Sequence, residues 1–137
     1  TAEAEALYRE GLETLRRHDP GHPEVGYALH NLADALAEAG RAAEAESMYL
    51  EAIAHKGGAM GEDHHEVAAS RANLAALLAS CGRRDEAYLL AQGAAARTEH
   101  LPSSHPVRVG CEAVAARLKP RAVPRVSESP SDSSSTQ

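Results

Sequence analysis

The sequence predicts an all-α protein, an α-solenoid of stacked antiparallel helix pairs, and three observations support this fold class. Of the 137 residues, 29 are alanine and 14 are leucine, whereas Phe and Trp are absent and there is one Ile. Alanine, leucine, glutamate and arginine form helices readily, and a β-sheet needs the β-branched and aromatic residues that are scarce here. Apolar residues recur at helical spacing, and one sequence pattern occurs twice at an offset of 42 residues.

The opening segment, residues 1–19, is expected to form one helix. Its leucines Leu7, Leu12 and Leu15 share an apolar stripe, and its sequence matches residues 44–53, in the second helix of a repeat. Repeats bury their faces only against neighbours. We therefore expect one side of this helix to be exposed, and the helix either to fray or to self-associate with a second copy. The sequence begins without Met, so we expect it to be part of a longer protein.

The first full repeat spans residues 22–58, and its sequence predicts two helices. Pro23 suits the first turn of a helix, because its missing N–H costs nothing there. Gly40 permits the left-handed backbone that ends the first helix. Gly57 and Gly58 are expected to end the second helix and to begin a flexible loop between the repeats.

The second full repeat spans residues 64–100, with helices expected at about 65–80 and 84–98. Asp63 is the candidate N-cap of its first helix. A third partial copy begins at a His-Pro pair and predicts a closing helix over residues 105–118.

A pattern of leucines and small residues marks each repeat. The first copy reads Leu29-x2-Leu32-Ala33-x2-Leu36, then Ala45-x3-Tyr49; the second reads Arg71-x2-Leu74-Ala75-x2-Leu78, then Ala87-x3-Ala91. These residues resemble the tetratricopeptide repeat. The period of 42 and the His-Pro-x-Val start resemble the longer repeats of kinesin light chains. HEAT repeats have a similar period, but the Leu-Ala pair favours tetratricopeptide repeats. The resemblance covers about residues 2–118.

Small residues are expected where two helices cross closely, which in this pattern means Ala33 and Ala75. The second copy departs from the pattern at two places. Arg71 replaces a large apolar residue, and Ala91 replaces the tyrosine. We therefore expect the helix pair of the second repeat to pack more loosely than that of the first.

Composition and charge exclude several function classes. The formal net charge is −6, and phosphate contact needs clustered Lys and Arg, so no nucleic-acid partner is expected. No stretch of about 18 apolar residues could cross a membrane. Cys81 and Cys111 form no CxxC pair, so we expect free thiols in a reducing compartment and a cytoplasmic location.

The sequence offers no convincing catalytic or metal-binding set, so we expect no enzyme activity and no cofactor. His22, His64 and His105 recur with the repeat, which suits a role in shaping the helix starts better than metal binding. Cys81 lies at a helix end, where the dipole does not favour a thiolate. Cys111 shares an apolar helix face and is expected in the core.

The inner, concave surface of the array is the candidate site, because the first helix of each repeat lines it. The expected groove residues are Tyr27, His30, Asn31, Asp34 and Glu38 in the first repeat, and Ala69, Ala72, Asn73, Ala76 and Ser80 in the second. An amide both donates and accepts hydrogen bonds, so it can pair with an extended peptide backbone. The resemblance implies this role for Asn31 and Asn73. The alternative is that they only bridge neighbouring helices.

The function expected from this groove is binding of a peptide or protein segment. Two alternatives remain open: a structural spacer within a longer array, and a regulatory segment attached to an ATPase or another enzyme. The groove lacks Lys and Arg in its first two units, which disfavours a ligand with a C-terminal carboxylate. Residues 119–137 are rich in Ser and Pro and predict a disordered tail.

Overall fold

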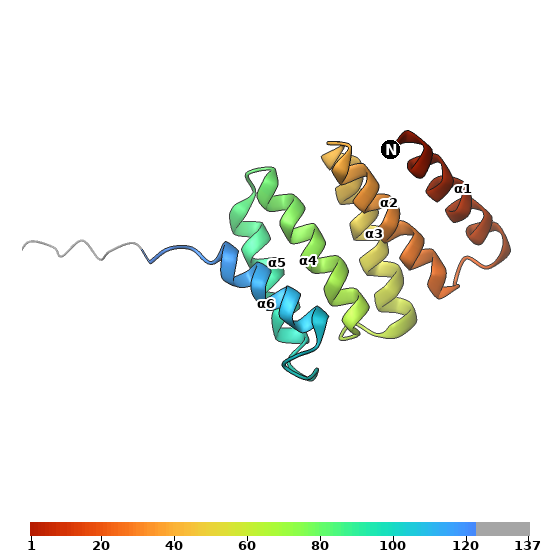
Figure 1. The fold of residues 1–137 in the computed structure, drawn as a ribbon. Helices are drawn as coiled ribbons and strands as arrows, with labels where there is room; N and C mark the ends of the chain where they lie inside the picture. The colour runs from red at the N-terminus through yellow and green to blue at the C-terminus, as the bar shows by residue number, and fades with distance from the viewer. Residues whose placement is uncertain (123–137) are drawn as a thin grey trace, which may run out of the picture.

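The computed structural model describes residues 1–122, which fold into six α-helices joined by short connections (Figure 1). The helices are α1 (Ala2–His18), α2 (Pro23–Glu38), α3 (Ala42–Met60), α4 (His65–Ser80), α5 (Arg84–Arg97) and α6 (Pro106–Leu118). They confirm the predicted all-α solenoid. The disordered tail is predicted for residues 119–137, and residues 123–137 of it lie outside the described part of the chain.

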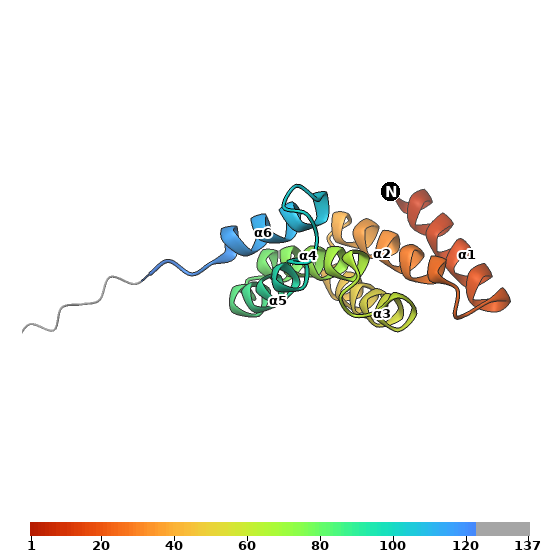
Figure 2. The same ribbon diagram turned by 90° about the horizontal axis from the view of Figure 1, so that it is seen from below.

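The helices pack in the order of the chain, as expected for a repeat array. Each helix of α1 to α5 contacts the next one, and α6 packs against both α4 and α5. Figure 2 shows α2 and α4 side by side in one layer and α3 and α5 in a second layer, with α6 above α4. The first helices of the repeats therefore share one face of the molecule.

Leucines and alanines at the repeat positions form one continuous core. Leu29, Leu32 and Leu36 of α2 are at most 1% exposed. Ala33 and Ala75 are completely buried, as expected for positions at helix crossings. Burial of these side chains provides the main stabilisation, because each large aliphatic side chain removed from water contributes about 1.5–3 kcal/mol.

The looser packing predicted for the second helix pair stays a prediction. Helix α5 has 14 residues and α3 has 19, so the interface of α5 with α4 is also shorter. Arg71 extends to Glu62, where its guanidinium donates to the carboxylate at 2.5 Å, instead of filling the core as Leu29 does. Ala91 is buried where the first repeat has the larger Tyr49.

A histidine caps the first helix of each repeat. Nδ1 of His22, His64 and His105 accepts a hydrogen bond from the backbone N–H two residues later, at 3.1 Å in each case. The predicted role of these histidines at helix starts is confirmed. The prediction that Asp63 caps α4 is wrong. Its carboxylate instead accepts a hydrogen bond from Arg97 at 2.9 Å.

The end predicted for α3 is also wrong. The helix continues through Gly57 and Gly58 to Met60, and the chain turns at Gly61 with a φ of 97°. A side chain at Gly57 would meet the carboxylate end of the flexible Glu62 side chain, which would have to shift. Gly40 follows α2 with a φ of 79°, the left-handed conformation expected there.

Two ion pairs link the repeats at equivalent positions. Arg41, which precedes α3, donates to Glu5 of α1 at 2.6 Å. One repeat later, Arg83 precedes α5 and donates to Glu46 of α3 at the same distance. Hydrogen bonds to Glu44 and Glu5 raise the pKa of Arg41. Each second helix is thus tied to the second helix before it.

The exposed side predicted for the opening helix is present. Leu12 of α1 is 5% exposed and packs into the core, whereas Leu7 is 67% exposed. Leu15 is half-buried, and Tyr8 is 38% exposed. Self-association through this helix stays a prediction.

No helix within residues 1–122 combines the length and the apolar character that a bilayer crossing requires.

Candidate binding groove

The predicted groove residues lie on α2 and α4, and three surface hollows bring most of them together. The hollow between the C-terminal halves of α2 and α4 has a volume of about 350 Å³. Its lining includes Glu38, Asn73, Ala76 and Ser80 from the predicted set. Tyr27 lines none of the three hollows. It lies near the other end of α2, where its hydroxyl is 4.0 Å from the Met60 sulfur.

A second hollow, of about 230 Å³, separates α1 from the neighbouring side of α2. It contains the predicted residues Asn31 and Asp34, and Glu38 extends to it as well. Thr1, Ala4 and Tyr8 of α1 form its other wall. Asn31 and Asn73 therefore lie in different hollows, although the repeat places them at the same position.

The third hollow lies between α4 and α6 and is apolar. Its lining consists mostly of small or aliphatic side chains: Ala69, Ala72, Asn73, Val107, Gly110, Cys111 and Val114. The volume is about 160 Å³. Cys111 is 1% exposed, as expected for a core cysteine, and burial raises the pKa of its thiol. Small residues on α4 leave this space open.

The carboxylate of Asp34 is the centre of a polar cluster. It accepts hydrogen bonds from the Tyr49 hydroxyl and, at 3.2 Å, from Nδ2 of Asn73. Nε2 of His30 lies 3.3 Å from its other oxygen. Partial burial alone would raise the pKa of Asp34, but these contacts outweigh burial and hold the pKa below its usual value. Asp34 therefore carries a negative charge at neutral pH.

A buried lysine extends this cluster into the protein. Lys56 of α3 is 1% exposed, and its ammonium donates to Oγ of Ser70 at 3.1 Å. Ser70 is hydrogen-bonded in turn to Nδ1 of His30 at 2.8 Å. The ammonium also lies 3.5 Å from the Glu66 carboxylate and 4.9 Å from the centre of the Tyr27 ring. Burial lowers the pKa of Lys56, and Glu66 offsets part of that effect.

Sequence reasoning missed the contributions of Tyr49, Lys56 and Ser70. The sequence pattern marks Tyr49 only as a repeat position and does not mark the two others. A signal was present at Gly26, which replaces the alanine of the second repeat. A side chain at Gly26 would lie 2.6 Å from Cγ of Lys56, so the glycine leaves space for the buried lysine stem.

Ser70, His30 and Asp34 follow one another like the members of a hydrolase triad, but their placement does not suit nucleophilic catalysis. Ser70 is fully buried, so a substrate cannot reach its hydroxyl. The hydroxyl also accepts a hydrogen bond from Lys56. The cluster joins α2, α3 and α4, and its evident role is to fix the positions of Asp34 and Asn73 at the groove.

The two repeated asparagines differ in their contacts. Nδ2 of Asn73 donates to Asp34 and lies 3.2 Å from Nε2 of His30, so Asn73 bridges α4 and α2. The alternative that it serves only as a bridge stays a prediction. Its amide oxygen accepts no hydrogen bond within residues 1–122 and lies at an exposed position between two hollows. Asn31 is exposed and forms no such bridge in that part of the chain.

The histidines do not gather into a metal site. Within the described part of the chain, no group of three or more His, Cys, Asp or Glu side chains could hold a metal ion. His64 and His65 stack at 4.3 Å, and His105 lies 5.2 Å from His65. Only His64 and His105 of this group serve as caps.

Comparison with known proteins supports the repeat assignment. A family model described as tetratricopeptide repeat matches residues 1–56, and a second model with the same description matches residues 67–106. No curated protein matches the chain. Together the two matches cover α1, α2 and α5 and most of α3 and α4. The chain therefore belongs to the tetratricopeptide repeat family.

Proposed function

We propose that this protein binds an extended segment of a partner protein along the face of α4, in the groove between α2 and α6. Tetratricopeptide repeats are generally protein–protein interaction modules and generally non-catalytic. The observation that carries the proposal is the environment of Asn73. This residue lines both the α2–α4 hollow and the α4–α6 hollow.

The groove holds Asn73 in an orientation that suits peptide binding. Because Asp34 accepts from the Asn73 amide nitrogen, the amide oxygen is directed away from that carboxylate. That oxygen is available for a backbone N–H of a bound segment. The Lys56 cluster fixes Asp34 before any partner arrives, which lowers the entropy cost of binding.

The chemistry of the two hollows defines the preferred partner. The α4–α6 hollow is lined by Ala69, Val107 and Val114 and suits an aliphatic side chain. The α2–α4 hollow carries the exposed Glu38, and two of its lining residues, Tyr49 and Asn73, donate to ionised Asp34 behind them, which favours a basic side chain. A partner segment would therefore carry an aliphatic residue and a Lys or Arg, one on each side of the backbone contact to Asn73.

A peptide-display selection on the immobilised whole chain tests this function. Selected peptides should pair an aliphatic with a basic residue. Asn73→Ala should weaken their binding by about 0.5–1.5 kcal/mol through the lost hydrogen bond. Asn31→Ala, measured separately and combined with Asn73→Ala, tests the predicted role of Asn31. Gln92→Ala, an exposed amide on α5, is the matched control.

Circular dichroism and urea unfolding should show that each variant stays folded. Peptides that bind the Asn73→Ala variant as tightly as the parent would contradict the proposed groove. Selection of acidic rather than basic peptides would contradict the role assigned to Asp34 and Glu38.

A further inference from the structure

The segment that follows α6 carries the kinds of side chain that the groove favours. Residues 119–126 read KPRAVPRV, with three cations, two valines and no carboxylate. Pro120 and Pro124 disfavour a helix, and proline favours an extended backbone. A short extended segment with basic and aliphatic side chains matches the partner chemistry described above.

The groove offers complementary charge and complementary apolar surface. Exposed Glu38 lines the α2–α4 hollow, and ionised Asp34 lies behind the lining. No Lys or Arg of residues 1–122 lines this hollow or the α4–α6 hollow. The α4–α6 hollow is lined mainly by small and aliphatic side chains. A cation is therefore complemented in the first hollow and a valine in the second.

The segment leaves α6 close to the groove. Leu118, the last residue of α6, is 2% exposed and belongs to the same buried cluster as Leu78 of α4. By the repeat, Leu118 corresponds to Leu77, which lines the α2–α4 hollow. Three extended residues span about 10 Å, roughly the distance between two packed helices. The backbone of Arg121 can therefore lie over the end of α4, with its side chain toward Glu38.

The length of the segment matches the distance between the hollows. Ser80 lines one hollow and Ala69 lines the other. They lie eleven residues apart on α4, which corresponds to about 16 Å of helix. Arg121 and Val126 lie five residues apart, and an extended chain covers about 16 Å over that length. Asn73 lines both hollows, beneath the middle of such a segment.

We propose that residues 119–126, the docking segment, bind in the groove of their own chain. The docking segment runs antiparallel to α4, with Arg121 beside Glu38 and Val126 in the α4–α6 hollow. This inference rests on the proposed function, because it places an internal competitor in the same groove.

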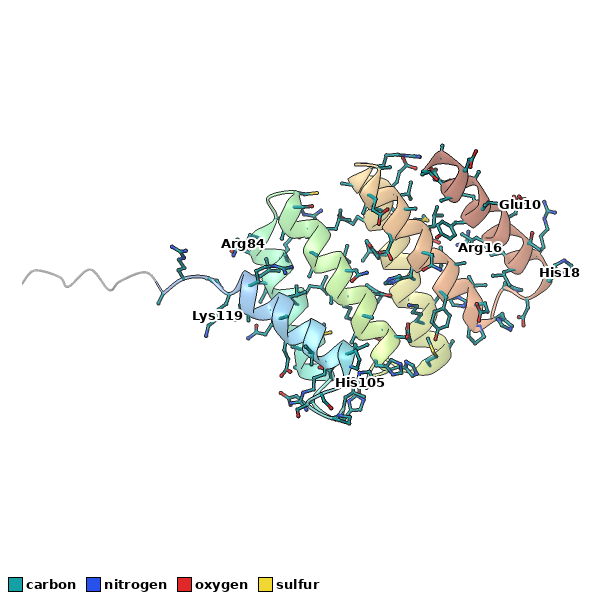
Figure 3. The ribbon with its side chains drawn as sticks, viewed as in Figure 1. Glu10, Arg16, His18, Arg84, His105 and Lys119 are labelled. Carbon is teal, nitrogen blue, oxygen red and sulfur yellow. The ribbon has the colours of Figure 1, made fainter. Side chains whose placement is uncertain are left out.

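Docking requires the chain to turn directly after α6. Residues 119–122 lead away from α6 in the structure (Figure 1). Figure 3 shows Lys119 at this end of the array, far from Glu10 of α1. Proline is favoured at the second position of a β-turn, which is the place of Pro120 in a turn that begins at Lys119. Such a turn leaves α6 intact and directs the docking segment back over α4.

A tethered segment needs only weak contacts to occupy the groove. Because the docking segment is joined to α6, one wall of the groove, its effective concentration is on the order of millimolar. A dissociation constant of about the same size keeps the groove occupied in about half of the molecules. A partner segment must compete with this occupancy, which lowers its apparent affinity.

Limited trypsin digestion of the whole chain tests the docking, because trypsin cuts after Arg125 and a docked backbone is protected. A free peptide of residues 117–130 gives the unprotected rate. We expect cleavage after Arg125 to be about twofold or more slower in the whole chain. Glu38→Gln should bring the rate close to that of the peptide. Glu10→Gln changes an exposed carboxylate at the other end of the array and should leave the rate unchanged.

Competition with an external peptide gives a second measurement. In the whole chain, Arg121→Gln should tighten binding of a peptide selected on the groove by about twofold or more. Arg17→Gln is the matched control, because the Arg17 side chain is 72% exposed on α1. Glu38→Gln combined with Arg121→Gln should speed cleavage after Arg125 no more than either change alone. Circular dichroism checks that each variant keeps its helices.

Three results would overturn the inference: cleavage as fast as in the free peptide, protection that survives Glu38→Gln, and protection that rises with protein concentration. The last result would assign the docking segment to the groove of a second copy. Asn73-dependent binding of selected peptides with an unprotected docking segment would overturn this inference alone. Protection that depends on Glu38, with no external peptide selected, would overturn the proposed function alone.

Discussion

The interface among α2, α3 and α4 and its equivalent among α4, α5 and α6 share a helical framework but differ in chemistry. The first contains the polar residues His30, Asp34, Tyr49, Lys56, Ser70 and Asn73. One repeat later the same positions hold Ala72, Ala76, Ala91, Thr98, Cys111 and Val114. The leucine and alanine pattern sets how the helices pack, whereas the positions between helices can change together. One half of the groove is thereby polar, and the other half is apolar.

The largest effect is expected where the repeats differ in their core. Leu29 and Arg71 occupy the same repeat position, but only Leu29 is fully buried. Leu29→Ala should lower the free energy of unfolding by about 2–5 kcal/mol through the cavity it leaves. Arg71→Ala should cost about 1 kcal/mol or less, because Glu62, its partner, is exposed. Urea unfolding measures both, and equal costs would contradict the comparison.

The shared framework should respond alike in both repeats. Ala33→Leu and Ala75→Leu each force a large side chain into a fully buried crossing. We expect each to cost about 1–3 kcal/mol through overpacking. Ala96→Leu, at an exposed position of α5, serves as the control with an unchanged melting temperature. A melting temperature of Ala33→Leu equal to that of the parent would show that the helix crossing is not close there.

Substitutions at Gly26 and Lys56 should have coupled effects on stability. The second repeat has Ala68 and Thr98 at these two positions, so both residues differ together. Gly26→Ala alone should destabilise the protein, since the new methyl group meets the lysine stem. With Lys56→Thr already present, the same change should be better tolerated. A double-mutant cycle in urea should give a coupling of about 1 kcal/mol. Additive effects would show that the glycine serves another purpose.

The smallest effect concerns pH. The contacts of Asp34 lower its pKa in the folded protein, so its contribution to stability is present above its usual pKa and is lost as the pH falls through the folded value. The stability difference between the parent and Asp34→Asn should thus be greatest near neutral pH and shrink in acid. Tyr49→Phe removes one donor and should reduce this dependence. A difference that stays constant with pH would contradict the assignment.

The helical array could be predicted from the sequence because its buried residues recur at a fixed spacing. Leu32 with Leu74 and Ala33 with Ala75 recur at one spacing, and each pair is buried in the structure. The end of α3 could not be predicted, since glycines such as Gly57 and Gly58 normally disfavour a helix, yet here the helix continues through both to Met60. The helical period predicts which residues share the face of α2 and α4, and their role in binding stays a prediction.

The polar cluster behind the groove could not be predicted from one sequence. Lys56 and Ser70 are ordinary surface residues by type, and lysine is rarely buried. Their burial depends on three helices meeting, which no local pattern encodes. The different contacts of Asn31 and Asn73 could not be predicted either, because they also depend on a neighbouring helix. Only Asn73 has a preceding first helix within the described residues that offers a carboxylate.

The histidine caps make the helix starts of the repeats interchangeable. The same atom, Nδ1, accepts the same kind of backbone hydrogen bond at the start of α2, α4 and α6. A first helix can therefore begin in the same way in each repeat, whatever side chains its later turns carry. The conserved start fixes where each first helix begins, and the positions between the helices are left free to differ from one repeat to the next.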